Sequence, residues 1–198
     1  MTWYMCLPLS TDVVQNLGDY DGSKLQALTK EGLKFGDEDE DTQKKRTKAY
    51  REAFKPLTKF LKDLLAGKVA KVIVSQRVES SPAVIVTSQY GHTANMERIM
   101  RAQTFANPEV LKSMQASKTL ELNPRHPIIV ELNKKVQSEP DAESTKNLAH
   151  LIFDSALMSS GFVHDDVDSF AVRMQQVMAS SLNLQSLELV DEVAVEEE

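Results

Sequence analysis

Two consecutive segments with apolar faces at helical spacing occupy the last third of the chain, and they constrain the fold most. In both, apolar or small residues recur three and four positions apart, as on one face of a helix. The first face, which ends before Gly161, contains Leu148, Leu151, Ile152, Ser155 and Ser159. The second contains Phe170, Met174, Val177, Met178 and Leu182. Little chain remains to cover these faces, and two such hairpins would close a four-helix bundle, so we expect a homodimer.

Strand signals lie in the middle of the chain. Residues 71–78 and 83–89 are β-branched runs separated by "ESSP", which predicts a hairpin. Residues 119–122, "TLEL", are expected to add a third strand. The chain is therefore expected to be α+β, with a small mixed sheet, a curved array of helices, and a final helical hairpin that forms the bundle across the dimer.

Two more helices are predicted around this sheet. An apolar stripe that Gly67 ends contains Leu57, Phe60, Leu61, Leu64 and Leu65. In "HPIIVELNKKV", Pro127 suits the first helical position, and Ile128, Leu132 and Val136 are expected to share one face.

The first residues predict a strand at "WYMC", a helix over 11–20, a turn at "DYDGS" and a strand through "KLQALT". The first strand has nothing before it to pair with, so we expect the chain to begin inside a domain. We expect one boundary near residue 35, a main domain over 36–185, and an acidic disordered tail over 186–198.

Composition and charge exclude several classes of protein. A net charge of −6 argues against broad nucleic-acid affinity, which needs a positive surface. The single cysteine, Cys6, excludes an internal disulfide framework. No run approaches the length of a membrane span, so no membrane partner is expected.

An acidic run, 37–41, precedes a basic stretch that includes Lys44, Lys45, Arg46, Lys48 and Arg51. This order suits a helix whose acids lie at its N-terminus, and it is typical of a solvated helix face. The alternative is that a basic helix over 44–62 binds an acidic partner, in which case the protein would be a dimeric scaffold.

No catalytic or metal site is predicted. His92, His126, His150 and His164 lack the spacing of a zinc site. His150 and Asp154, four residues apart, are interpreted as a surface contact. The glycines are dispersed, so no phosphate-binding loop is present, and the chain is not expected to be an enzyme by itself.

The segment "SQYGHTANMERIMRAQ", residues 88–103, predicts a helix capped by Thr93. Met96, Ile99, Met100 and Gln103 follow the spacing of one face. This face either packs in the core or forms an adaptable apolar surface, because Met is frequent at promiscuous binding sites. The segment that follows contains Leu111 and Met114 and is expected to be a short helix or an ordered loop.

The same segment, with "LELNPRHPII" and "SALMSSGF" in the same order, resembles the C-terminal region of heat shock protein 90 chaperones. Residues 1–35 resemble the end of the family's middle domain. The resemblance implies an ATP-dependent chaperone that assists protein folding, a homodimer built by the last two helices, and binding of client proteins. It places eight residues at or near the dimer interface: Leu148, Leu151, Ile152, Ser155, Phe170, Met174, Val177 and Met178.

The resemblance also implies a client-binding surface formed by His92, Met96, Met100, Leu111 and Met114. His92 stands where the family usually has Trp, so its contact with clients is open. The sites for ATP and Mg in the full-length protein lie in an N-terminal domain, and no cofactor is expected here.

"VSQR", "SQYG" and "KEGLKF" are most similar to the endoplasmic-reticulum form of the family. The expected compartment is the reticulum lumen, with the cytoplasm as the alternative. The end "EVAVEEE" in place of MEEVD argues against tetratricopeptide-repeat co-chaperones as partners.

Overall fold

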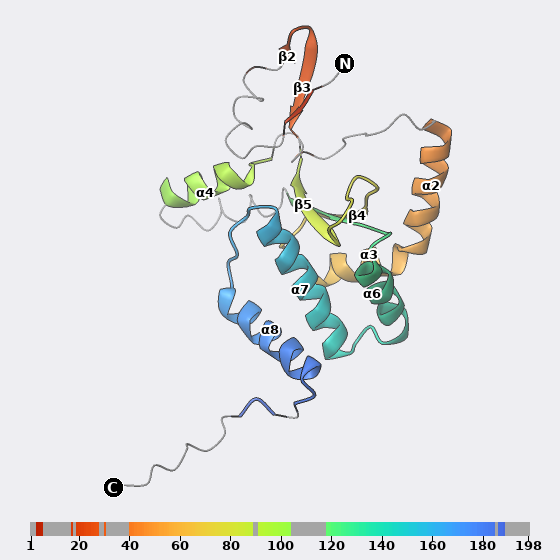
Figure 1. The fold of residues 1–198 in the computed structure, drawn as a ribbon, viewed down its shortest axis with the longest axis vertical. Coiled ribbons are helices and arrows are strands. Elements are labelled where there is room, and N and C mark those ends of the chain that lie inside the picture. The colour runs from red at the N-terminus through yellow and green to blue at the C-terminus, as the bar shows by residue number, and fades with distance from the viewer. Residues whose placement is uncertain are drawn as a thin grey trace. The chain divides into compact units, whose positions relative to one another are not determined.

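The computed structural model of the chain describes residues 3–5, 17, 19–27, 30, 40–88, 91–103, 118–184 and 186–188 (Figure 1). The chain divides into two units, residues 1–164 and 165–198, and each is described by itself. Within the described ranges, no helix combines the length and the apolar character needed to cross a bilayer.

The N-terminal strands form a small sheet of their own. β1 (Trp3–Met5) pairs in parallel with β3 (Ser23–Ala27), which pairs antiparallel with β2 (Asp19–Tyr20). Asp21 and Gly22 have φ values of 50° and 70°, the signs that a tight two-residue hairpin turn requires. The predicted strands and turn are confirmed.

Two predictions for this region are wrong. The first strand does have a partner, since β1 pairs with β3. The helix predicted over 11–20 cannot reach residue 20, because Asp19 and Tyr20 form β2. Of the remaining positions in that helix, only Leu17 is described, and it is helical.

The central sheet has the order β4-β6-β5, from β4 (Lys71–Val74), β6 (Lys118–Leu122) and β5 (Ala83–Thr87). β6 pairs in parallel with β4 and antiparallel with β5. The third strand and the mixed sheet were predicted correctly, but the hairpin between β4 and β5 was wrong. All five residues of β6 are buried. At the centre of the sheet its backbone N–H and C=O groups can pair with a strand on each side, so these buried groups have hydrogen-bond partners.

The helices α2 (Glu40–Ala53), α3 (Lys55–Leu64) and α6 (Pro127–Ser138) belong to the same unit as this sheet (Figure 1). The chain is not helical at Phe54, just before Pro56, so the basic stretch 44–62 is two helices rather than one. The α+β fold class is confirmed.

A single hydrophobic core joins these helices to the sheet and to α7 (Glu143–Ser159). Among its fully buried side chains are Leu57, Leu61, Leu65, Leu120, Leu122, Ile129 and Leu132. In α6 the buried face is Ile129, Leu132 and Val136, whereas Ile128 is exposed. The predicted face was therefore wrong at one position: Ile129, rather than Ile128, lies on the side of α6 that meets the core.

Gly161 ends α7 as predicted, with φ at 83°. The N–H of Phe162 donates to the carbonyl of Leu157, and that of Gly161 donates to the carbonyl of Met158. This pair of bonds is the Schellman arrangement, which places glycine at the left-handed position after a helix.

α8 (Val167–Ser181) belongs to the second unit. It begins at Asp166, whose side chain accepts from the N–H of Ser169, and it ends with Asn183 at φ 56° in a second Schellman arrangement. None of its residues is buried. The four-helix bundle needs a second chain and stays a prediction, as do the domain boundaries. In the predicted tail, 186–188 are described and 189–198 lie outside the described residues.

Candidate functional site

The helix predicted in "SQYGHTANMERIMRAQ" is α4 (Ala94–Gln103), and Thr93 caps it as expected. Thr93 Oγ1 accepts a 3.3 Å hydrogen bond from the N–H of Met96, and the Thr93 carbonyl accepts from the N–H of Glu97. Thr93 is buried, so the cap also fixes where α4 leaves the body of the protein.

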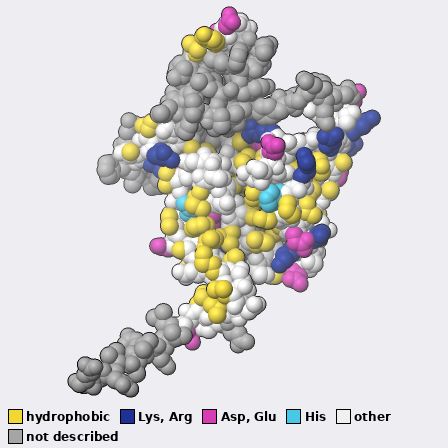
Figure 2. Space-filling view, in the orientation of Figure 1, with side chains coloured by type: hydrophobic (Ala, Val, Ile, Leu, Met, Phe, Trp, Pro, Cys, Tyr) yellow, Lys and Arg dark blue, Asp and Glu magenta, His cyan; other side chains and the backbone are white. Residues whose placement is uncertain are grey.

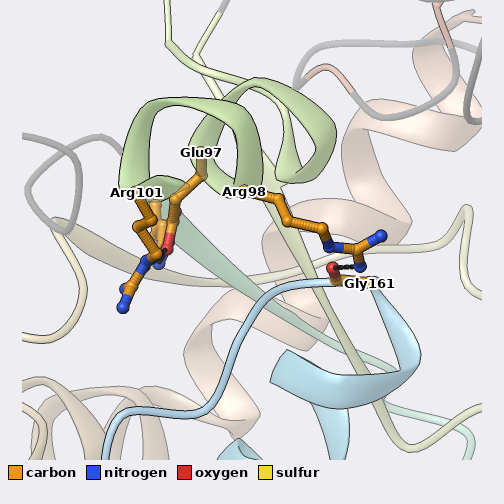
Figure 3. Close-up of polar contacts among 5 residues, drawn as sticks. Glu97, Arg98, Arg101 and Gly161 are labelled. Carbon is orange, nitrogen blue, oxygen red and sulfur yellow. Dashed lines mark hydrogen bonds and ion pairs between the residues drawn. The ribbon is translucent and has the colours of Figure 1, made fainter. Parts of the chain in front are cut away.

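A buried carboxylate anchors α4. Glu97 is 1% exposed, and its Oε2 lies 2.9 Å from the Nζ of Lys118, which is itself buried in β6. Its Oε1 accepts from Nη2 of Arg101 at 2.8 Å; Figure 3 shows these two side chains meeting one turn apart. The Lys118 ammonium also lies 4.7 Å from the ring centroid of Phe162. Two cations therefore compensate one buried anion, which a buried charge requires.

Two further sets of hydrogen bonds connect α4 and the segment before it to other parts of the first unit. Arg98 Nη2 donates to the Gly161 carbonyl at 3.0 Å, which connects α4 to the turn after α7 (Figure 3). Lys30 Nζ donates to the carbonyls of Gly91, at 2.7 Å, and Ser88, at 3.3 Å, in the segment that leads into α4. Burial lowers the pKa of Lys30 from its ordinary value, because desolvation disfavours the ammonium.

The structure places the predicted client-binding residues on and before α4. Met96 and Met100 are half-buried, Ile99 is 45% exposed, and His92, just before the helix, is half-buried. Among the described α4 residues, the one that packs against the hydrophobic core is Ala94. Within the described part of the chain, the two methionines are therefore not members of the core. Leu111 and Met114 lie outside the described residues.

The predicted dimer residues of α7 differ in how accessible they are to a second chain. Ile152 is buried in the core of its own chain, and Leu148 packs partly against that core. Leu151 is half-buried and Ser155 is exposed. Met158, which the sequence analysis did not include, is exposed three residues after Ser155 and continues the same spacing.

On α8, Phe170 and Met174 are half-buried, whereas Val177 and Met178 are exposed. Exposed hydrophobic side chains are visible on the face of the molecule drawn in Figure 2. Val167, at the first position of α8, is also exposed and precedes Phe170 by three residues, so it extends this face by one turn.

The described residues contain no group of three His, Cys, Asp or Glu side chains that could hold a metal ion. Asp154, interpreted above as part of a surface contact, is fully buried, and His164 Nε2 lies 2.9 Å from its Oδ1. Their separation of ten positions explains why helical spacing did not reveal this pair.

Comparison with known proteins identifies the family. The family model described as "Hsp90 protein" matches residues 2–198. The chain is 41% identical over 186 residues to the Endoplasmin homolog of Arabidopsis thaliana, which covers 93% of the chain and 22% of that protein. It is 40% identical over 194 residues to the Putative heat shock protein HSP 90-beta-3 of Homo sapiens, which covers 98% of the chain and 32% of that protein. Heat shock protein 83 of Leishmania donovani is 36% identical over 194 residues, 98% of the chain and 42% of that protein. The chain thus spans less than half the length of these relatives, and it belongs to the heat shock protein 90 family.

Proposed function

We propose that these 198 residues are the dimerisation and client-binding region of an ATP-dependent molecular chaperone that assists protein folding. The observation that carries this proposal is the family match, which extends over residues 2–198. The proposed division is the end of a middle domain over 1–35, a dimerisation domain over 36–185 and an acidic tail over 186–198.

The proposed dimer interface uses the apolar residues of α7 and α8 that their own chain leaves accessible. Five of the predicted residues are half-buried or exposed, as expected of a surface that a second copy would cover: Leu151, Phe170, Met174, Val177 and Met178. Ile152 supports this surface from within the core. A dimer would hold two chaperone arms at high effective concentration, so their transient closure would be nearly intramolecular.

The proposed client surface is the accessible side of α4 with Met96 and Met100, next to His92 and the segment with Leu111 and Met114. The anchor at Glu97 supports this proposal, because it holds α4 in place while Met96 and Met100 remain only half-buried, and methionine is a flexible side chain that suits varied apolar contacts. Such a surface would bind many apolar client sequences weakly and would discriminate little among them.

ATP and Mg binding are proposed for other parts of the full-length protein. The described residues contain no candidate group of metal ligands, and the sequence has no phosphate-binding loop. The proposed compartment is the endoplasmic reticulum, because two of the relatives carry the name Endoplasmin homolog. The alternative compartment is the cytoplasm, because other relatives are named HSP 90-beta-3 and heat shock protein 83 rather than Endoplasmin homolog.

The test is binding of a fluorescently labelled, chemically unfolded polypeptide, measured by anisotropy without ATP at 0.1 and 1 M salt. A client surface made of methionine should bind at both salt concentrations, because its affinity does not depend on charge. Absence of binding at either concentration would contradict the proposal.

The alternative is a scaffold that binds an acidic partner through the basic residues of α2 and α3. It is favoured by one observation: all the basic side chains of α2 are exposed, namely Lys44, Lys45, Arg46, Lys48 and Arg51. In the same assay a labelled poly-glutamate would bind at 0.1 M salt and be released at 1 M.

A further inference from the structure

Lys30 is a buried lysine whose side chain reaches the turn just before α4. The residue is 5% exposed, and its Nζ donates to the carbonyls of Gly91, at 2.7 Å, and Ser88, at 3.3 Å. The Ser88 carbonyl also accepts a 3.0 Å hydrogen bond from the N–H of Gly91, so these two residues close the turn. One ammonium therefore bonds to the carbonyls at both ends of this turn.

The backbone of Lys30 is connected to the central sheet. Lys30 forms a parallel bridge with Thr87, the last residue of β5. The Lys30 carbonyl accepts a 2.8 Å hydrogen bond from Nη1 of Arg77, and Nε of Arg77 lies 2.6 Å from Oε2 of the buried Glu121 in β6. The ammonium thus extends to the turn from a backbone position that two strands of the sheet hold in place.

Stability alone does not account for an ammonium at this position. Among the described residues, the Lys30 ammonium bonds to carbonyl oxygens and forms no ion pair. Burial lowers its pKa, because desolvation disfavours the charged form. An apolar side chain of the same length would avoid this desolvation. What the ammonium adds is geometry, because it brings two carbonyls to a single donor group.

The turn determines where the chain enters α4. Gly91 lies two residues before the buried cap Thr93, whose Oγ1 accepts from the N–H of Met96. His92, half-buried, is the residue between them. A fixed Gly91 carbonyl therefore restricts the path of the chain from the turn, through His92, to the first turn of the helix.

We propose that Lys30 is a positioning residue for the client surface. By bonding to both carbonyls of the turn, it holds His92 and the start of α4 in the conformation that presents Met96 and Met100. Lys30 precedes the proposed domain boundary near residue 35, so the surface depends on residues from both sides of that boundary. This inference rests on the client-binding function proposed above.

The experiment measures binding of the labelled, unfolded polypeptide to variants of the 198-residue chain by anisotropy at 1 M salt. Lys30→Met keeps the length of the side chain and removes the donor. It should weaken binding about three- to tenfold, because binding must then order a segment that was previously held. Lys59→Met removes the same charge from an exposed position on α3 and should leave the affinity unchanged.

Amide hydrogen exchange without the polypeptide checks the local effect. In Lys30→Met, the amide of Gly91 should exchange faster, whereas the amides of β6 should keep their rates. The midpoint of urea unfolding should change little, because the lost hydrogen bonds are offset by the removal of a buried charge. If Lys30→Met does not fold, Lys30→Gln, whose amide is one atom short of the ammonium position, tests the same prediction.

A double-mutant cycle separates positioning from a general structural role. If Lys30 acts through α4, the loss from Lys30→Met and the loss from Met96→Ser with Met100→Ser should not add. The combined variant should bind about as weakly as the weaker of the two. Additive losses would overturn the proposal, because Lys30 would then act elsewhere.

Two further results would overturn it: unchanged binding in a folded Lys30 variant, or equal weakening in Lys30→Met and Lys59→Met. These results would leave the client-binding function itself intact. Absence of binding by the unaltered chain would instead contradict that function, and the role of Lys30 with it.

Discussion

α4 and α8 both present methionine and valine or isoleucine side chains to solvent, but the chain supports them differently. α4 is anchored to the protein by the buried side chain of Glu97, which pairs with Lys118 and Arg101. α8 has no buried residue, and its exposed side chains include Val172, Val177 and Met178. An anchored helix keeps a small surface ready for weak contacts, whereas a helix that buries nothing gains most of its stability by association.

The largest effect is expected from charges on α8. Met174→Glu with Val177→Glu should raise the dimer dissociation constant about a thousandfold or more, because association would then bury unpaired carboxylates. Sedimentation equilibrium measures this constant directly. Client binding per protomer, measured by anisotropy, should stay unchanged.

A matched pair of charges controls for the change in α8 itself. Val172→Glu with Gln176→Glu adds the same charge on the opposite side of the helix from Met174. We expect that variant to remain dimeric. If both variants dissociate equally, the face proposed for the interface is misplaced.

The next largest effect concerns the anchor of α4. Glu97→Gln leaves the Lys118 ammonium buried without a carboxylate, so the free energy of unfolding should fall by about 3 kcal/mol. Lys118→Met should cost less, because Glu97 keeps Arg101 as a partner. Urea denaturation compares the two, and a larger loss in Lys118→Met would show that Lys118 has another role.

The helix caps provide a matched comparison of intermediate size. Thr93→Ala removes the side-chain acceptor of α4 and Asp166→Ala removes that of α8, each at a cost of about 1 kcal/mol. Amide hydrogen exchange should quicken in α4 alone for the first variant and in α8 alone for the second. Only the second effect should diminish as protein concentration rises, because dimerisation stabilises α8 by mass action. Equal concentration dependence would contradict the difference between the helices.

The smallest effect is expected at the client surface. Met96→Ser with Met100→Ser should weaken binding of the unfolded polypeptide by less than about 1 kcal/mol for each residue, as for contacts on an adaptable surface. Ile128→Ser removes an equally accessible apolar side chain from α6 and serves as the control. A stronger loss in the control than in the methionine variant would remove α4 from the client surface.

Periodicity predicted the helices and strands well where one face meets the core. Residue types at single positions identified the cap at Thr93, the turn at Asp21 and Gly22, and the helix end at Gly161, because each of these features depends on local backbone and side-chain chemistry. Periodicity failed for the order of the central sheet, since the pairing of β6 with both β4 and β5 joins segments far apart in sequence.

The anchor of the candidate site was missed for a related reason. Glu97 and Arg101 lie one turn apart, and this spacing was a signal that sequence reasoning could have used. The partner that explains why Glu97 is buried, Lys118, is 21 residues away and looks like an ordinary surface lysine in the sequence. The burial of Ile129 rather than Ile128 likewise depends on how α6 meets the core.

In the proposed dimer, Phe170, Met174, Val177 and Met178 of α8, with the accessible side of α7, join two copies of this chain. Light scattering coupled to size exclusion, over a dilution series, tests it most directly. We expect a mass of twice 22.2 kDa that falls toward the monomer only at the lowest concentrations. A mass of 22.2 kDa at every concentration would contradict it.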